Sequence, residues 1–119
     1  MIKTASIYSP QAGAGSLRVL VTRYWPRGVR KEAQDRWFRL LGPEPALIKA
    51  WKSGSIGWDE FRERYLAEYS SIEKKAALDE LSALVKGAGG DVTLLCTCME
   101  DAPCHRKILK ELLTCKQKP

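Results

Sequence analysis

The stretch that most limits the possible folds is DVTLLCTC, residues 91–98, whose residues 92 and 94–96 are apolar with little alternation. A strand with one face in water alternates between apolar and polar residues, whereas a strand covered on both faces is apolar throughout. We therefore predict a central, buried strand here. A helical pattern follows soon after, and this succession of strand and helix is typical of α/β folds.

Residues 2–7 and 17–25 also have strand patterns, and residues 19–21 form a second continuous apolar run. Helical patterns occupy residues 30–43 (ambiguously), 43–54, 58–72, 72–90 and the region from about Asp101 onward. Strands separated by helices favour a mostly parallel sheet. The length of 119 residues suits one domain. We predict a small layered α/β domain over residues 1–119, with a mostly parallel sheet flanked by helices.

Periodicity assigns faces to two of these helices. The helix over 58–72 carries a stripe at helical spacing, formed by Trp58, Phe61, Tyr65, Tyr69 and Ile72. Such a stripe is more typical of a core than of a ligand surface. In the last helix, with Asp101 as its expected N-cap, Cys104 and His105 fall on the inward side of the first turn. The same periodicity points Arg106 outward.

Two loops rich in reactive side chains follow the predicted strands. They are RYWPRG, residues 23–28, and CTCMEDAPCHR, residues 96–106. In parallel sheets, ligands gather beyond the carboxyl ends of the strands. If the two strands are parallel neighbours, both loops lie on one rim. We therefore predict a composite, electropositive pocket between segments about eighty positions apart.

The first loop is expected to bind the ligand. Arg23 and Arg27 carry guanidinium groups, which bind phosphate or carboxylate through paired hydrogen bonds. Trp25 offers a flat face that can stack on a base or form a wall of the pocket. Pro26 and Gly28 restrict the loop, so less conformational entropy is lost on binding.

The second loop contains three of the four cysteines and the only histidine. A helix start attracts anions and lowers the pKa of a thiol, and Arg106 adds positive charge. We expect Arg106 to help hold the anion and His105 to act as acid or base. Cys98 or Cys104 is the candidate nucleophile. The alternative to a cysteine nucleophile is that the cysteines only fill the core, beside a His–Arg pair that binds the anion.

Two other uses of these thiols stay open. Cys96, Cys98, Cys104 and His105 could supply four soft metal ligands, but the spacing C-x-C-x5-C-H is not a usual zinc pattern. We therefore predict no metal and no cofactor. Alternatively, Cys98 and Cys104 could pair reversibly as a redox couple. A thiol phosphatase is disfavoured, because seven residues rather than five separate Cys98 from Arg106.

The charge is uneven along the chain. The net charge is +6, and residues 1–52 hold ten Lys or Arg against three Asp or Glu. A basic half suggests an anionic partner, either a phosphorylated small molecule or a nucleic acid. A non-catalytic nucleic-acid-binding module is therefore the rival to an enzyme.

No run approaches the ~18 apolar residues of a membrane span, and no secretory signal is evident. We expect a cytoplasmic protein with reduced thiols and no membrane partner.

The motifs resemble those of one known family. RVLVTRYWPRGVRKE, residues 18–32, resembles the signature of the YeaO-like family, the domain of unknown function 488. WDEFRERYLAEY and CTCMEDAPCHR are similar to further segments of that family. The resemblance implies a small α/β domain in which the two loops meet, without implying an activity. Members commonly carry Asp before the first Arg, where this chain has Thr22.

Overall fold

The computed structural model, which describes residues 1–98 and 103–117, contains a parallel sheet of four strands among those residues. The strands are β1 (Ile2–Ser6), β2 (Leu17–Leu20), β3 (Arg36–Trp37) and β4 (Val92–Cys96). Their order is β1-β4-β2-β3, and every pairing is parallel. All five residues of β4 are buried. The prediction of a mostly parallel sheet with a central, buried last strand is therefore confirmed.

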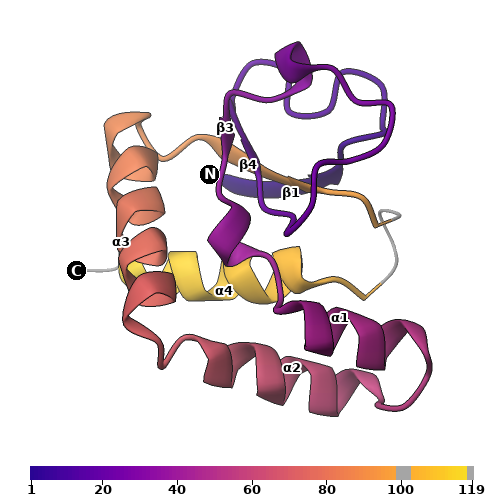
Figure 1. Cartoon of the computed structure of the whole chain (residues 1–119). Coiled ribbons are helices and arrows are strands. Elements are labelled where there is room, and N and C mark those ends of the chain that lie inside the picture. Colours follow the sequence, from indigo (N-terminus) through magenta and orange to yellow (C-terminus); the bar gives the residue numbers. More distant parts are fainter. Residues whose placement is uncertain (99–102, 118–119) are drawn as a thin grey trace.

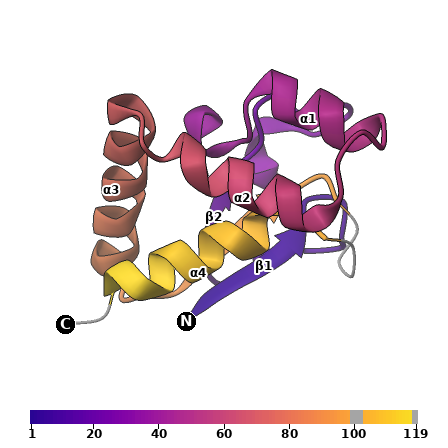
Figure 2. The ribbon, with the colours of Figure 1, turned by 90° about the horizontal axis from the view of Figure 1, so that it is seen from below.

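The α-helices cover one face of this sheet (Figure 1). They are α1 (Pro45–Lys52), α2 (Trp58–Glu68), α3 (Ile72–Gly87) and α4 (His105–Gln117). Helix α4 packs against β1 and β4, with α2 on its other side (Figure 2). Loops rather than helices cover the opposite face, where Leu20 and Leu95 pack with Ile7 and loop residues. None of the described helices has the length and apolar character needed to cross a membrane.

The predicted helix within residues 30–43 is wrong. This segment instead forms two short 3₁₀ turns, Lys31–Ala33 and Arg39–Leu41, on either side of β3. Asp35 explains the difference, because its carboxylate accepts hydrogen bonds from the backbone N–H and the guanidinium of Arg18. These bonds attach the segment to the edge of β2, where the backbone pairs as a strand.

Two helix boundaries also differ from the prediction. Helix α2 ends at Glu68, and Ile72 is the exposed first residue of α3 rather than a member of the core stripe. The hydroxyl of Ser71 accepts from the N–H of Lys74 and so caps a new helix at this point. The last helix begins at His105, after Pro103, while its expected cap Asp101 lies outside the described residues.

Gly42 marks a close approach between the segment before α1 and the loop after β2. A Cβ atom at this position would lie 2.3 Å from the backbone nitrogen of Arg23. The Gly42 carbonyl also accepts hydrogen bonds from the Arg23 guanidinium and the Lys74 ammonium. The absence of a side chain therefore lets the loop after β2 sit directly against the helical layer.

Gly42→Ala is expected to lower the free energy of unfolding by about 1–3 kcal/mol, because backbone atoms must move to admit the methyl group. Urea denaturation of the variant measures this loss. Gly87→Ala is the control, since no atom lies within 4 Å of its added Cβ. That control should be neutral or slightly stabilising in a helix. Equal stability of the two variants would contradict the close approach.

Candidate functional site

The two predicted loops meet at one rim of the sheet. Strands β2 and β4 are parallel neighbours, so the residues after Leu20 and after Cys96 leave the same edge. A cavity of about 340 Å³ opens there, and both Arg27 and His105 line it. Residues 22–27 and Thr97, Cys98, Pro103 and Cys104 contribute to the same cavity, which we call the rim pocket. The predicted convergence of the two segments is therefore present in the structure.

His105 joins the start of α4 to the loop after β2. Its Nε2 lies 2.6 Å from the carbonyl oxygen of Val21, which can only accept, so Nε2 carries the proton. Its Nδ1 faces the Cys104 sulfur at 3.6 Å. Burial lowers the pKa of His105 to about 4, which keeps the ring neutral at physiological pH. The imidazole therefore presents a bare Nδ1 to the thiols.

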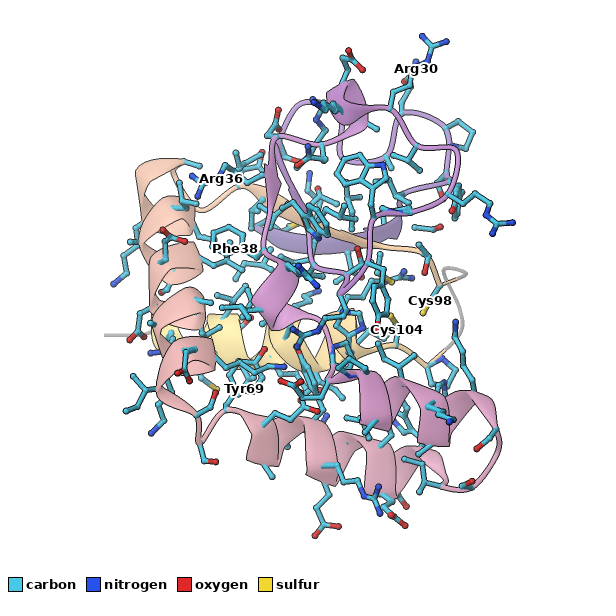
Figure 3. All side chains as sticks on the ribbon, viewed as in Figure 1. Arg30, Arg36, Phe38, Tyr69, Cys98 and Cys104 are labelled. Carbon is cyan, nitrogen blue, oxygen red and sulfur yellow. The ribbon has the colours of Figure 1, made fainter. Side chains whose placement is uncertain are left out.

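Three thiols cluster beside this imidazole. The sulfur atoms of Cys96, Cys98 and Cys104 all lie within 4.8 Å of one another, and those of Cys96 and Cys104 are 2.8 Å apart. Cys98 and Cys104 lie close together near the start of α4 (Figure 3). Cys96 and Cys104 are buried, whereas Cys98 is half-buried and lines the rim pocket. Cys104 also lines the pocket, but Cys98 is the more exposed of the two thiols.

The cluster favours a thiolate on Cys98. Hydrogen bonds from Cys104 and then Cys96 lower the pKa of Cys98, and the charge of Arg106 acts in the same direction. Contacts with Cys96 and Cys98, together with burial, raise the pKa of Cys104. A single negative charge shared by the cluster accounts for these opposite shifts, because the first thiolate opposes a second. The thiol whose pKa is lowered therefore lines the pocket.

The outward orientation predicted for Arg106 is wrong. Its side chain is only 1% exposed. Its Nη1 donates to the sulfur of Cys96 at 2.9 Å and to the carbonyl of Cys98 at 3.1 Å. Arg106 is absent from the residues that line the rim pocket, so its contact with an anion stays a prediction. Its place in the structure is beneath the thiol cluster, where it supplies positive charge.

Of the first loop, Arg27 is the guanidinium best placed for a ligand. It is exposed, lines the pocket and forms no ion pair with any described residue. Arg23 also lines the pocket, but its guanidinium donates to the carbonyls of Gly42 and Pro43 and is 3.3 Å from Glu44. Trp25 lines the pocket with a half-exposed ring whose Nε1 donates to Val29. The loop thus offers one available cation and one aromatic wall.

The sequence analysis missed the opposite wall of the pocket. Trp51, Lys52, Trp58 and Phe61 line it from the end of α1 and the start of α2. The rings of Trp58 and Phe61 stack at 5.2 Å, and Trp51 packs edge-on against Trp58. The aromatic periodicity correctly signalled packing. It carried no signal that one end of the stripe borders a cavity, because that follows from how α1 and α2 pack below the rim.

Two further residues bear on the chemistry of the site. Thr22 donates its hydroxyl to the carbonyl of Tyr24 and lines the pocket. It therefore shapes the loop and supplies no carboxylate. The three clustered sulfurs are spaced closely enough to share a soft cation. Arg106 places a fixed positive charge against Cys96, which opposes cation binding there.

Comparison with known proteins identifies the family. A family model described as "Active DUF488-N3 subclade" matches residues 2–117. The chain belongs to this DUF488 family. It is 36% identical over 76 residues to the uncharacterized protein YeaO of Escherichia coli K12, a match that covers 62% of this chain and 66% of YeaO. It is 31% identical over 114 residues to the uncharacterized protein Rv3073c of Mycobacterium tuberculosis, covering 94% and 92% of the two chains. No solved structure matches the chain significantly.

Proposed function

We propose that this DUF488 protein binds an anionic ligand in the rim pocket and attacks it with the Cys98 thiolate. The observation that carries the proposal is that one cavity is lined by the half-buried Cys98 and by two exposed cations, Arg27 and Lys52. Neither cation is ion-paired to another described residue. Cations without a protein carboxylate at the mouth of a pocket favour anionic ligands.

The proposed reaction is group transfer through a covalent thio-intermediate. The Cys98 sulfur forms a bond to an electrophilic atom of the ligand, and the leaving group departs with its bonding electron pair. Water then attacks the same atom, the bond to sulfur breaks, and the thiolate is restored. The proton released by that water neutralises the leaving group. Every atom and electron is thus supplied by the ligand, water and Cys98.

The neighbouring residues keep the sulfur ready for this step. The thiols of Cys104 and Cys96 lower the pKa of Cys98, and Arg106 adds positive charge beneath them. His105 fixes the orientation of Cys104 through its contacts with Val21 and the thiol. In this proposal His105 is a positioning residue, and proton transfer by its Nδ1 passes through Cys104. The description of the matching family as an active subclade accords with a chemical role.

A pair of alkylating agents tests both halves of the proposal. We expect Cys98 to react with iodoacetamide at about pH 6, where an ordinary thiol is almost wholly protonated. We also expect the ratio of the iodoacetate labelling rate to the iodoacetamide labelling rate to be higher at Cys98 than at Cys115. The reason is that Arg27 and Lys52 attract the carboxylate of iodoacetate. Mass spectrometry of peptides gives the rate at each cysteine. The exposed Cys115 serves as the reference thiol in the same chain.

Arg27→Ala should reduce the preference for iodoacetate, because Lys52 remains, and should leave the reaction with iodoacetamide intact. Cys98→Ser should abolish labelling in the pocket and leave labelling of Cys115 intact. The proposal fails if Cys98 reacts no faster than Cys115 at about pH 6. The anion-binding part of the proposal fails if the ratio of the two labelling rates is the same at Cys98 and Cys115.

A further inference from the structure

A second hollow adjoins the rim pocket on the loop side of the sheet. Its lining residues are Trp25, Val29, Arg30, Lys31, Glu32, Gln34 and Trp37, and we call this surface the loop groove. Trp25 lines both hollows, so the two surfaces adjoin at this residue. Arg27, in the pocket, and Arg30, in the groove, mark the path between them. Arg30 extends outward from the loop, far from Cys98 (Figure 3).

The loop groove has more positive charge than its own carboxylate neutralises. Arg30 and Lys31 form no ion pair with any residue in the described part of the chain, and Glu32 is the acidic residue of the groove. Together with Arg27 and Lys52, these cations form a track that runs from the groove into the pocket. The rim pocket alone could hold a single charged group, but a track of this extent fits a polyanion.

Aromatic rings alternate with these cations. Trp25 is 36% and Trp37 38% exposed, and their rings meet edge-to-face at 5.3 Å. Tyr8 and Tyr24 are 55% and 56% exposed and line the rim pocket. Hydrogen bonds from Trp25 Nε1 to Val29 and from Trp37 Nε1 to Thr22 hold the indoles in place, and more than a third of each residue remains exposed. Exposed aromatic faces next to free cations are the surface on which unpaired bases stack.

We propose that the natural ligand is a single-stranded nucleic acid, with one nucleotide in the rim pocket and its neighbours along the loop groove. This proposal rests on the anion-binding half of the proposed function and specifies its ligand. The pocket volume of about 340 Å³ lies in the range of small-molecule sites, which suits one nucleotide. A duplex would keep its bases stacked inside, away from the aromatic walls. An acidic peptide would use the cations but leave the exposed indole faces unexplained.

Fluorescence anisotropy tests the proposal on the whole protein. The probe is a labelled single strand of about 12 nucleotides, a length within the usual range of one binding domain. We expect it to bind more tightly than a duplex of the same sequence or free adenosine monophosphate used as competitor. Its affinity should fall about 50-fold between about 50 and 200 mM salt, as expected for four phosphate contacts to a single strand.

Variants assign the binding to the two surfaces. A plot of the logarithm of the binding constant against the logarithm of the salt concentration has a negative slope. Arg30→Ala combined with Lys31→Ala should make this slope smaller in magnitude by about 1.4, the contribution of two contacts to a single strand. Trp25→Ala should weaken binding about 5- to 100-fold through lost stacking, with circular dichroism confirming the fold. The control is Lys86→Ala, an exposed cation at the C-terminal end of α3, which should change nothing.

Cys98→Ser separates this proposal from the proposed chemistry, because it removes the nucleophile and should leave strand binding unchanged. The proposal is overturned if adenosine monophosphate competes as well as the strand, or if the duplex or polyglutamate binds equally tightly. Unaltered binding by the Arg30 and Lys31 double variant would exclude the loop groove.

Discussion

Replacing Glu68 with alanine is expected to lower the free energy of unfolding by about 3–5 kcal/mol, which would be a large part of the stability of a domain this size. The Glu68 carboxylate lies 2.6 Å from the ammonium of Lys74, whose side chain is only 3% exposed. Burial lowers the pKa of Lys74, while Glu68 opposes that shift by stabilising the charged form. Removing Glu68 would leave a buried cation without its carboxylate. Urea denaturation at neutral pH measures the loss.

The double variant Glu68→Ala, Lys74→Met provides the matched control. Removing both charges should recover most of the lost stability, because the desolvation cost of the ammonium disappears with its partner. Lys74 also donates to the carbonyl of Gly42 and lies over the rings of Tyr65 and Tyr69, contacts that methionine replaces only by packing. A loss below about 1 kcal/mol in the single variant would show that the pair behaves as a surface salt bridge.

The sequence predicted those parts of the fold that depend on local pattern. The apolar run of β4 identified the central strand, and periodicity located the helices after residue 43. The segment 30–43 could not be predicted in this way, because its conformation depends on Asp35 bonding to Arg18, seventeen positions earlier. Nor did any sequence pattern predict that loops cover the second face of the sheet. Isolated apolar loop residues such as Val29 and Ala33 carry no periodic signal.

The candidate site was predicted in outline and missed in its details. The parallel topology brought the two loops to one rim, as reasoning about strand ends had suggested. Arg106 was misplaced, because a periodicity argument assigns charged residues to solvent and contains no information about nearby acceptors. The Cys96 sulfur and the Cys98 carbonyl supply those acceptors inside the protein. Lys74, buried against the Gly42 carbonyl and Glu68, escaped notice for the same reason.

The stability of the protein is expected to fall as pH is lowered through the range in which His105 should titrate. Burial lowers the pKa of His105 to about 4 in the folded protein, against about 6.5 for an exposed imidazole. Between these values the unfolded chain binds more protons than the folded one, so the free energy of unfolding rises with pH. The contribution of His105 is present above about 6.5 and is lost toward about 4. Between about pH 7 and pH 5 the loss should be about 2 kcal/mol.

His105→Gln isolates this contribution, because glutamine does not titrate and its amide can still donate toward the Val21 carbonyl. Carboxylates such as Asp35, whose pKa is lowered by hydrogen bonds from Arg18, also weaken the fold on acidification. They do so in both proteins, so the difference between the two urea-denaturation profiles reports on position 105. We expect the variant to be less stable at neutral pH and to lose about 2 kcal/mol less on acidification to about pH 5. Parallel pH profiles would mean that the pKa of His105 is the same in the folded and the unfolded chain, which would contradict the burial of a neutral imidazole at this position.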